Sequence, residues 1–341
     1  MCRRACTVGN QLNMTDNTNM NTLTFSEGTE KAKVLEQEIR KCVVGQDRVV
    51  REMVIGLLGG GHILIEGVPG LGKTLLARTM ARAAGSGFNR IQFTPDLMPN
   101  DITGHGMFDM RDNQFKIRRG PIFCHFLLAD EINRAPAKTQ AALLEAMQEQ
   151  QVTIEGKSLA LARPFLVLAT QNPIEQEGTY PLPQAQTDRF MFKIFIGYPS
   201  HEDEQKIVRA VTNSSIGDTL DSSMGNPVLT PAEVLTMQQL LAEMTVDEQI
   251  VDYIVRIVRT TRDWNGIEHG AGPRGAINML RAARGNAMLE AREFVTPDDV
   301  KSVALPVLRH RIKLSADLEI EGYTSDLVLA ELLNGVKAPR T

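Results

Sequence analysis

Residues 66–74 read EGVPGLGKT, directly after an apolar run, HILI, and directly before a helix-like stretch, LLARTMARAA. Gly67, Gly72, Lys73 and Thr74 have the spacing of a P-loop, whose glycines let backbone N–H groups face phosphate oxygens. The start of the following helix adds partial positive charge. Lys73 is predicted to reach the β- and γ-phosphates, and the Thr74 hydroxyl to join a Mg²⁺ shell. The predicted nucleotide-contacting residues of the loop are Gly67, Pro69, Gly70, Gly72, Lys73, Thr74 and Leu75.

Two further apolar runs end in polar residues that suit phosphate chemistry. FLLADE ends in Asp130, which would hold Mg²⁺ directly or through water, and Glu131, which could polarise an attacking water as general base. LVLATQNP ends near Asn172, which would hold that water if its strand lay between the other two. The alternatives are a solvated strand end for the acids and a turn-forming Asn-Pro for Asn172.

Three arginines are candidates for stabilising charge on the phosphates. Arg189, in TDRF, suits an arginine finger, which accelerates phosphoryl transfer by about 10³–10⁵; the alternative is a surface salt bridge with Asp188. Arg274, in GPRG, is predicted to begin a helix and reach the phosphates from a second domain, with a capping or solvated arginine as the alternative. Arg134, in EINRAP, either contacts a neighbouring subunit's nucleotide or braces the acids at 130–131.

The elements that must position these residues fall into two parts. From about residue 34 to residue 200, short apolar runs alternate with helical patterns, which favours an α/β fold with a parallel sheet; the runs are HILIEG, FNRIQF, IFCHFLLADE, FLVLATQNP and FMFKIFIG. Later, TPAE at 230 and TPDD at 296 have the pattern of capped helix starts. A C-terminal all-helical domain of four or five helices is therefore expected. The predicted divisions are a disordered tail at 1–30, an α/β core at 31–200, a linker at 201–228 and the helical domain at 229–341.

Composition argues against several classes of protein. The chain has 341 residues, a hydrophobic content of 43% and a net charge of −4, which argues weakly against a dedicated nucleic-acid binder. No run of about 18 apolar residues is present, so no membrane span is expected. The four cysteines form no metal-ligand pattern with histidine, and reduced thiols in a cytoplasmic protein are the expectation.

The ordered set EGVPGLGKT, LLADEINRAPAKTQAALLEAMQE, ATQNP, QTDRF and GPRG resembles the MoxR family of AAA+ ATPases, from about residue 34 to the C-terminus. The resemblance implies an α/β ATPase core, a helical lid and ATP with Mg²⁺ bound between them. It also implies a ring, typically a hexamer, with the arginine finger supplied in trans. VVGQDRVV resembles the start of the family's core, which places Val44 and Gly45 near the adenine base.

Two predicted hairpins fit the same resemblance. Residues 107–119 alternate around Asp112-Asn113 and resemble the insert in helix 2 that marks this branch of the AAA+ proteins. Residues 151–161 turn at Glu155-Gly156 and resemble the hairpin that precedes the sensor 1 strand. In rings such hairpins can face the pore and touch the client; ordinary surface hairpins are the alternative.

The chain also departs from the family pattern. Gln184 stands where relatives often carry Glu, Gly272-Pro273-Arg274-Gly275 where they often carry Ser-Pro-Arg-Ala, and Ala137 where a second proline is common. These differences put details of the lid-side contact in doubt and leave the phosphate-contacting side chains in place.

The resemblance implies an ATP-driven chaperone that remodels or matures protein complexes, including by metal-cofactor insertion. Von Willebrand factor A domain proteins are frequent partners in this family, and the client is not identified by the sequence. The alternatives are a nucleic-acid translocase of the helix-2-insert branch and a weakly hydrolysing, nucleotide-dependent scaffold. Neither a zinc ribbon nor an appended helix-turn-helix region supports the translocase, and Glu131, Asn172 and Arg189 argue against the scaffold.

Overall fold

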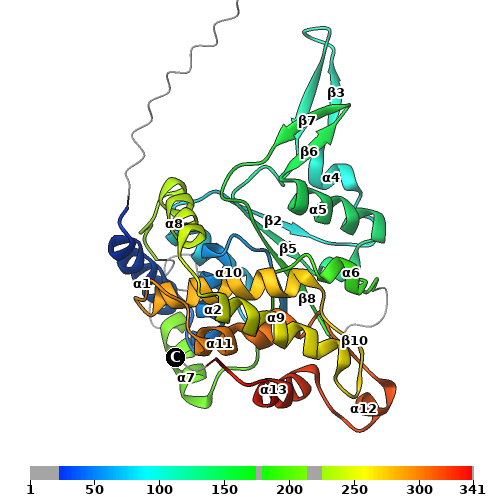
Figure 1. Cartoon of the computed structure of the whole chain (residues 1–341). Coiled ribbons are helices and arrows are strands. Elements are labelled where there is room, and N and C mark those ends of the chain that lie inside the picture. The colour runs from blue at the N-terminus through cyan, green and yellow to red at the C-terminus, as the bar shows by residue number, and fades with distance from the viewer. Residues whose placement is uncertain (1–22, 174–178, 213–224, 340–341) are drawn as a thin grey trace, which may run out of the picture.

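A computed structural model describes residues 23–173, 179–212 and 225–339 of the chain (Figure 1). The centre is a five-stranded sheet in the order β2-β5-β8-β1-β9, and every neighbouring pair is parallel. β8 lies between β5 and β1, as predicted for the strand that carries Asn172. The strands are β1 (Ile63–Glu66), β2 (Phe88–Gln92), β5 (Phe126–Asp130), β8 (Leu166–Gln171) and β9 (Phe192–Phe195).

Alternate residues of these strands enter two separate apolar cores, because successive side chains of a strand point to opposite faces. Ile63 and Leu168 enter the core under α1 (Phe25–Cys42), α2 (Asp47–Leu58) and α3 (Lys73–Ala83). Leu64 and Val167 enter the core on the other face, under α5 (Ala137–Glu149). α4 (Pro99–Thr103) packs beside α5. The sheet is therefore buried on both faces, as its continuous apolar strands predict.

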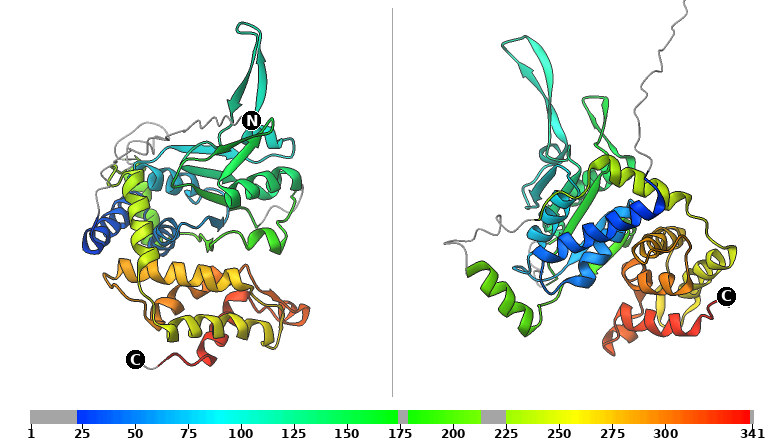
Figure 2. Two further views of the ribbon diagram at one scale, coloured as in Figure 1. Left: turned by 45° about the horizontal axis from the view of Figure 1, so that its top comes forward. Right: turned by 90° about the vertical axis from the view of Figure 1, so that its left-hand side faces the viewer.

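Both predicted hairpins are confirmed. β3 (Gly104–Asp109) pairs antiparallel with β4 (Gln114–Arg119), and β6 (Gln151–Ile154) pairs with β7 (Lys157–Ala160). Their turns contain left-handed residues, Asn113 with φ 52° and Gly156 with φ 74°. The two hairpins project from the same side of the core (Figure 2), and β3–β4 reaches farther.

The C-terminal domain is a helical bundle with a small sheet. Its helices are α8 (Pro231–Glu243), α9 (Glu248–Asp263), α10 (Pro273–Leu289), α11 (Pro297–Leu308), α12 (Ala316–Ile320) and α13 (Ser325–Gly335). The predicted capping boxes at Thr230 and Thr296 are both formed. The expectation of an all-helical domain is wrong in one respect: β10 (Ile267–His269) pairs antiparallel with β11 (Lys313–Leu314). Strands this short carry no readable alternation.

The domain boundaries also differ from the prediction. α1 begins at Phe25 with a capping box between Thr24 and Glu27, so the last residues of the expected tail are helical. α7 (His201–Thr212) occupies the first part of the expected linker. The remainder of the tail, 1–22, and the middle of the linker, 213–224, lie outside the described residues.

The helical domain packs on α1 and α2 and shares their core. Gly285 of α10 lies against Ile55 of α2 so closely that an added Cβ would meet an Ile55 methyl carbon at 3.1 Å. Beside this contact, Arg51 Nη2 donates to Asn286 Oδ1 at 2.9 Å. These contacts fix which surface of the bundle faces the sheet. Within the described ranges, no helix is long and apolar enough to span a bilayer.

His62 is a buried histidine immediately before β1. Its Nδ1 accepts from the Val167 N–H at 3.0 Å, and its Nε2 lies 3.1 Å from the Met147 carbonyl oxygen. With Nδ1 accepting, Nε2 carries the proton and donates. Burial lowers the pKa of His62 to about 4, because desolvation disfavours the charged ring.

His62 should make the free energy of unfolding depend on pH. Because its folded pKa lies below its unfolded value, its contribution is complete above about pH 6.5 and is lost as pH falls towards 4. We expect His62→Asn to remove about 3 kcal/mol of the loss in unfolding free energy between pH 7 and pH 4, measured by urea denaturation. His269→Asn, at an exposed site in β10, is the control and should follow the natural chain. Equal slopes for all three proteins would contradict the assignment.

Candidate nucleotide site

The loop between β1 and α3 has the backbone that phosphate binding requires. Gly70 and Gly72 have φ of 84° and 75°, a region that other residues rarely adopt. A Cβ on Gly67 would meet the Ile196 carbonyl oxygen at 2.7 Å. α3 begins at Lys73 without a side-chain cap, so its first N–H groups are available to an anion. The ammonium of Lys73 is held over the loop, where it donates to the Gly67 carbonyl at 2.8 Å.

Asp130 and Glu131 lie at the end of β5, at the same edge of the sheet as this loop and separated from it by β8. Thr170 Oγ1 donates to Asp130 Oδ1 at 2.5 Å and accepts from the Glu131 N–H at 2.9 Å. Arg90, from β2, donates to Asp130 Oδ2 at 2.7 Å. Asp130 is thus a buried carboxylate with polar partners on both oxygens, a donor type that suits Mg²⁺. Thr74, the other residue predicted to hold the metal, is the second residue of α3.

Glu131 has an unusual backbone conformation, φ 57° and ψ 49°, for a residue with a side chain. A left-handed non-glycine residue costs on the order of 1 kcal/mol and is typical of functional positions. The Glu131 carboxylate accepts from Gln92 Nε2 at 2.7 Å and pairs with Arg134 Nη1 at 2.9 Å. Arg134 therefore braces the acids within the chain, which is one of its two predicted roles.

Asn172 and the predicted adenine contacts lie at the same edge. Asn172 is buried directly after β8, and the parallel pairing of β8 with β1 brings Gln171 beside Glu66. Val44 and Gly45 form the turn between α1 and α2, where an added Cβ on Gly45 would meet Asp203 of α7 at 3.0 Å. Gln46, in that turn, donates to the Gly197 carbonyl at 2.9 Å, beyond the end of β9.

The two arginines lie at the opposite edge. Arg189 precedes β9, and the adjacent Met191 N–H donates to the carbonyl of His62, which precedes β1. Arg274 lies 3.6 Å from the Asp188 carboxylate, beside Arg189. Arg274 therefore lies at the opposite edge of the sheet from the P-loop of the same chain, with α10 packed on α1 and α2. Its predicted contact with nucleotide phosphates from the lid side stays a prediction.

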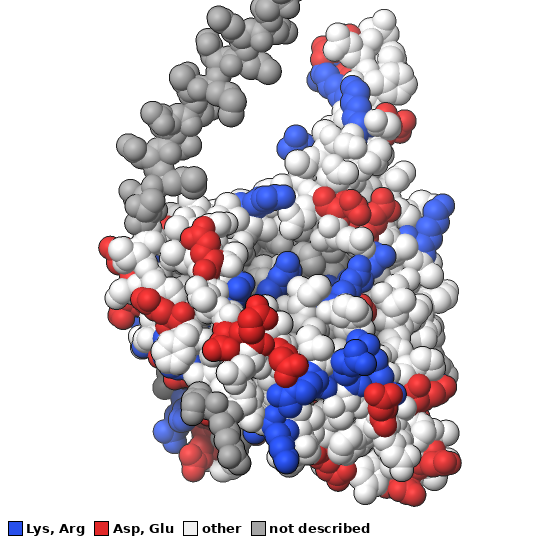
Figure 3. All heavy atoms as spheres, viewed as in Figure 1, with Lys and Arg blue, Asp and Glu red and all other residues white. Residues whose placement is uncertain are grey.

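These arginines line a cavity of about 270 Å³, which lies between the end of α5 and the first half of α10. It is lined by Arg189, Arg274 and Arg281, with Gln148 and Asn278 as polar neighbours. Figure 3 shows basic side chains around a hollow between α5 and α10. The Nε of Arg189 is buried without a hydrogen-bond partner among the described residues. The predicted alternative, a salt bridge between Arg189 and Asp188, is not among the ion pairs of the described chain, since Asp188 pairs with Arg311 and Arg274.

Sequence reasoning missed several residues of both edges. Arg90 and Gln92 alternate along β2 and carry no motif. Arg311, which pairs with Asp188, is 123 residues away in the sequence. Arg281 also lines the cavity. It follows Arg274 by seven residues, about two turns of α10, so both lie on one face of the helix. This spacing is a signal that the sequence does contain.

Comparisons with known proteins agree with this geometry. Residues 62–192 match the model of the ATPase family associated with various cellular activities (AAA), and residues 259–332 match the AAA lid domain. The chain is 43% identical to Chaperone MoxR1 of Mycobacterium tuberculosis, over 89% of this chain and 81% of that protein. It is 30% identical to Protein MoxR of Methylorubrum extorquens, over 87% and 91%.

A solved structure gives the same result for the fold. A crystal structure described as that of a candidate ATPase from Cytophaga hutchinsonii superposes with a TM-score of 0.85 at 41% identity, over 93% of this chain and 97% of that one. The relatives are matched over most of their own length, and the P-loop, the acid-terminated strand and the lid all fall within the matched residues. The chain belongs to the MoxR family of AAA+ ATPases.

Proposed function

We propose that this chain binds ATP with Mg²⁺ and hydrolyses it at sites shared between neighbouring subunits of a ring, a hexamer by resemblance. The observation that supports this most directly is that two groups of residues lie at opposite ends of the strands. Lys73 and Glu131 lie at the carboxyl ends, and Arg189 and Arg274 lie at the amino ends. A strand of four or five residues spans about 15 Å. The arginines of one chain therefore serve the ATP of a neighbour.

Each residue at the P-loop edge has a role in this proposal. The loop N–H groups and Lys73 bind the phosphates, and Val44 and Gly45 lie at the end where the base would sit. Mg²⁺ held by Thr74 and Asp130 would neutralise phosphate charge. Glu131 takes the proton of a water that Asn172 orients, and the neighbour's arginines stabilise the charge that develops on the γ-phosphate.

We further propose that hydrolysis drives chaperone-like remodelling of a protein client in the cytoplasm, with a von Willebrand factor A domain protein as partner. The projecting β3–β4 hairpin supports a protein client. Met110 and Phe115 near its tip are 85% and 79% exposed. Lys116 in the same hairpin pairs with Asp109 and Asp112, which reduces its attraction for a nucleic-acid backbone.

Replacing Lys73 tests the phosphate cradle. We expect Lys73→Ala to weaken Mg-ATP binding by about 10- to 100-fold, because a charge-assisted hydrogen bond contributes about 1.5–3 kcal/mol. A fluorescent ATP analogue measures the affinity. Lys313→Ala, at an exposed lysine of β11, is the control and should bind as the natural chain does. Unchanged affinity in Lys73→Ala would remove ATP from this loop.

Glu131→Gln separates binding from hydrolysis. We expect the ATPase kcat to fall by about 10²–10⁴ with little change in ATP affinity, because the amide cannot accept the proton of the attacking water. Glu243→Gln, at the end of α8, makes the same change where the carboxylate contacts Gln239, and should keep full activity. An ATPase rate in Glu131→Gln equal to that of the control would contradict the general-base assignment.

The partner proposal is tested by trapping the ATP-bound form. With ATP, Glu131→Gln should retain a von Willebrand factor A domain protein from the same genome on an affinity column. Glu131→Gln combined with Lys73→Ala should release it when ATP is supplied at a concentration that saturates only the natural loop, because the double variant binds ATP about 10- to 100-fold more weakly. Equal retention by both proteins, or by neither, would count against an ATP-controlled partner.

A further inference from the structure

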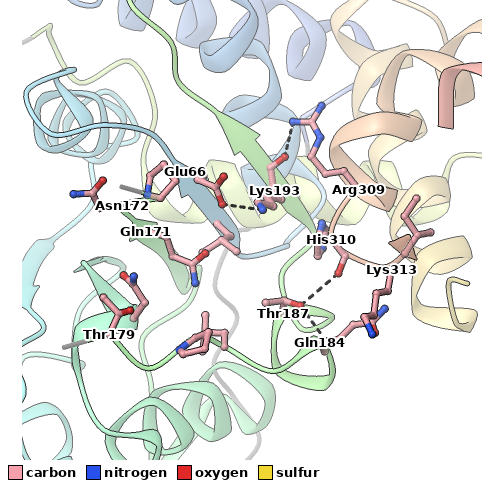
Figure 4. A pocket seen from close by; sticks show the side chains of 16 residues that line it. Glu66, Gln171, Asn172, Thr179, Gln184, Thr187, Lys193, Arg309, His310 and Lys313 are labelled. Atoms are coloured by element: carbon pink, nitrogen blue, oxygen red, sulfur yellow. Dashed lines mark hydrogen bonds and ion pairs between the residues drawn. The ribbon is translucent and has the colours of Figure 1, made fainter. Parts of the chain in front are cut away.

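The segment that connects α11 to β11 contacts residues 188–193, which include Arg189 and the start of β9. Arg309 Nη1 donates to the Lys193 carbonyl at 3.0 Å, and His310 Nε2 lies 3.1 Å from the Phe190 carbonyl oxygen. Arg311 is the third consecutive side chain that contacts this stretch. In the other direction, Gln184 Nε2 donates to the Arg311 carbonyl at 2.9 Å. Figure 4 shows Gln184 and the contact of Arg309 with Lys193. The lid and the segment at 184–193 are thus joined by hydrogen bonds in both directions.

Arg311 is the most deeply buried member of this junction, with its side chain 1% exposed. It donates to the carbonyls of Asp188 at 3.0 Å and Phe190 at 2.6 Å, on either side of Arg189. Its Nε donates to Asp188 Oδ1 at 2.9 Å. Burial lowers the pKa of Arg311 to about 10, and Asp188 opposes that shift, so the guanidinium stays charged at neutral pH.

Asp188 connects this buried arginine to the exposed face. One carboxylate oxygen pairs with Arg311, and the other lies 3.6 Å from Arg274 Nη1, whose side chain is 47% exposed. Arg189 is the next residue in the chain. The Asp188 carboxylate therefore contacts Arg274 directly and is anchored by Arg311. Arg189 is held through its backbone neighbours, because Arg311 donates to the carbonyls of Asp188 and Phe190.

We propose that Asp188 and Arg311 are positioning residues for catalysis in trans: they hold Arg189 and Arg274 at the geometry that a neighbouring subunit's γ-phosphate requires. This inference rests on the proposed function, because it needs an ATP site shared between subunits. Arg311 belongs to the lid. It therefore connects the lid directly to the residues around Arg189 and, through Asp188, to Arg274. A movement of the lid on its own core would carry both arginines with it.

A mixture of two inactive chains provides the test. At an ATP concentration that saturates only the natural loop, Lys73→Ala holds little ATP but supplies arginines, whereas Arg189→Ala holds ATP but supplies no finger. If sites are shared, mixing the two full-length proteins restores part of the ATPase activity, at sites where Lys73→Ala chains donate arginines to Arg189→Ala chains. Asp188→Asn is then added to one chain or to the other.

The inference predicts an asymmetric result. Asp188→Asn in the Lys73→Ala chain should lower the restored kcat by about 10- to 100-fold, the effect expected of displacing a catalytic group by about 1 Å. The KM for ATP should stay unchanged, because the other chain binds the nucleotide. Asp188→Asn in the Arg189→Ala chain should leave the restored activity intact, because that chain donates no finger. Arg311→Lys should repeat the asymmetry.

Asp326→Asn is the matched control. Asp326 pairs with Arg309, in the same segment, at the same 2.9 Å and with similar exposure, 33% against 26% for Asp188. In the Lys73→Ala chain it should leave the restored activity intact. Equal losses with Asp188→Asn in either chain, or no loss in the donor chain, would overturn the positioning role. No restoration in the parent mixture would instead overturn the shared site, and this inference with it.

Discussion

The parallel sheet is the constraint on which the rest of the molecule depends. Parallel pairing brings the carboxyl ends of β1, β5 and β8 to one edge, so the P-loop, Asp130, Glu131 and Asn172 meet there. The same pairing sends residues that precede a strand to the other edge. Arg189 precedes β9 and cannot reach the phosphates held after β1. In the proposed function a complete site therefore takes residues from two chains, and assembly is a condition of that chemistry.

Buried polar contacts hold both edges in shape. At the P-loop edge, Thr170 joins Asp130 to the backbone of Glu131, whose left-handed conformation needs such support. At the other edge, Arg311 joins Asp188 to the backbone around Arg189. Unpaired, each of these buried groups would be destabilising, because desolvation of a polar group costs on the order of 1–3 kcal/mol. Fully paired, they fix the side chains to which the proposed function assigns contacts with phosphate.

The sequence predicted the P-loop edge well because each of its parts is a contiguous motif. The loop follows an apolar strand, and the acids end another, so a parallel sheet brings them together. It also predicted the helix starts at Thr230 and Thr296, because a cap and its acid are three residues apart. It could not place Arg274, since the position of α10 depends on contacts such as Gly285 with Ile55. The pair of Asp188 with Arg311 joins residues 123 positions apart, and no local pattern records it.

In the proposed assembly, ATP lies between the P-loop of one subunit and the arginines of the next. The most direct measurement is an electron cryomicroscopy structure of the assembled protein with ATP and Mg²⁺, in which each guanidinium is assigned to its own chain. We expect Arg189 and Arg274 of one subunit to lie within about 3 Å of the γ-phosphate that the neighbouring Lys73 holds. An assembled, ATP-bound protein in which these arginines lie far from every neighbouring γ-phosphate, or in which Arg274 contacts the phosphates of its own chain, would contradict a shared site.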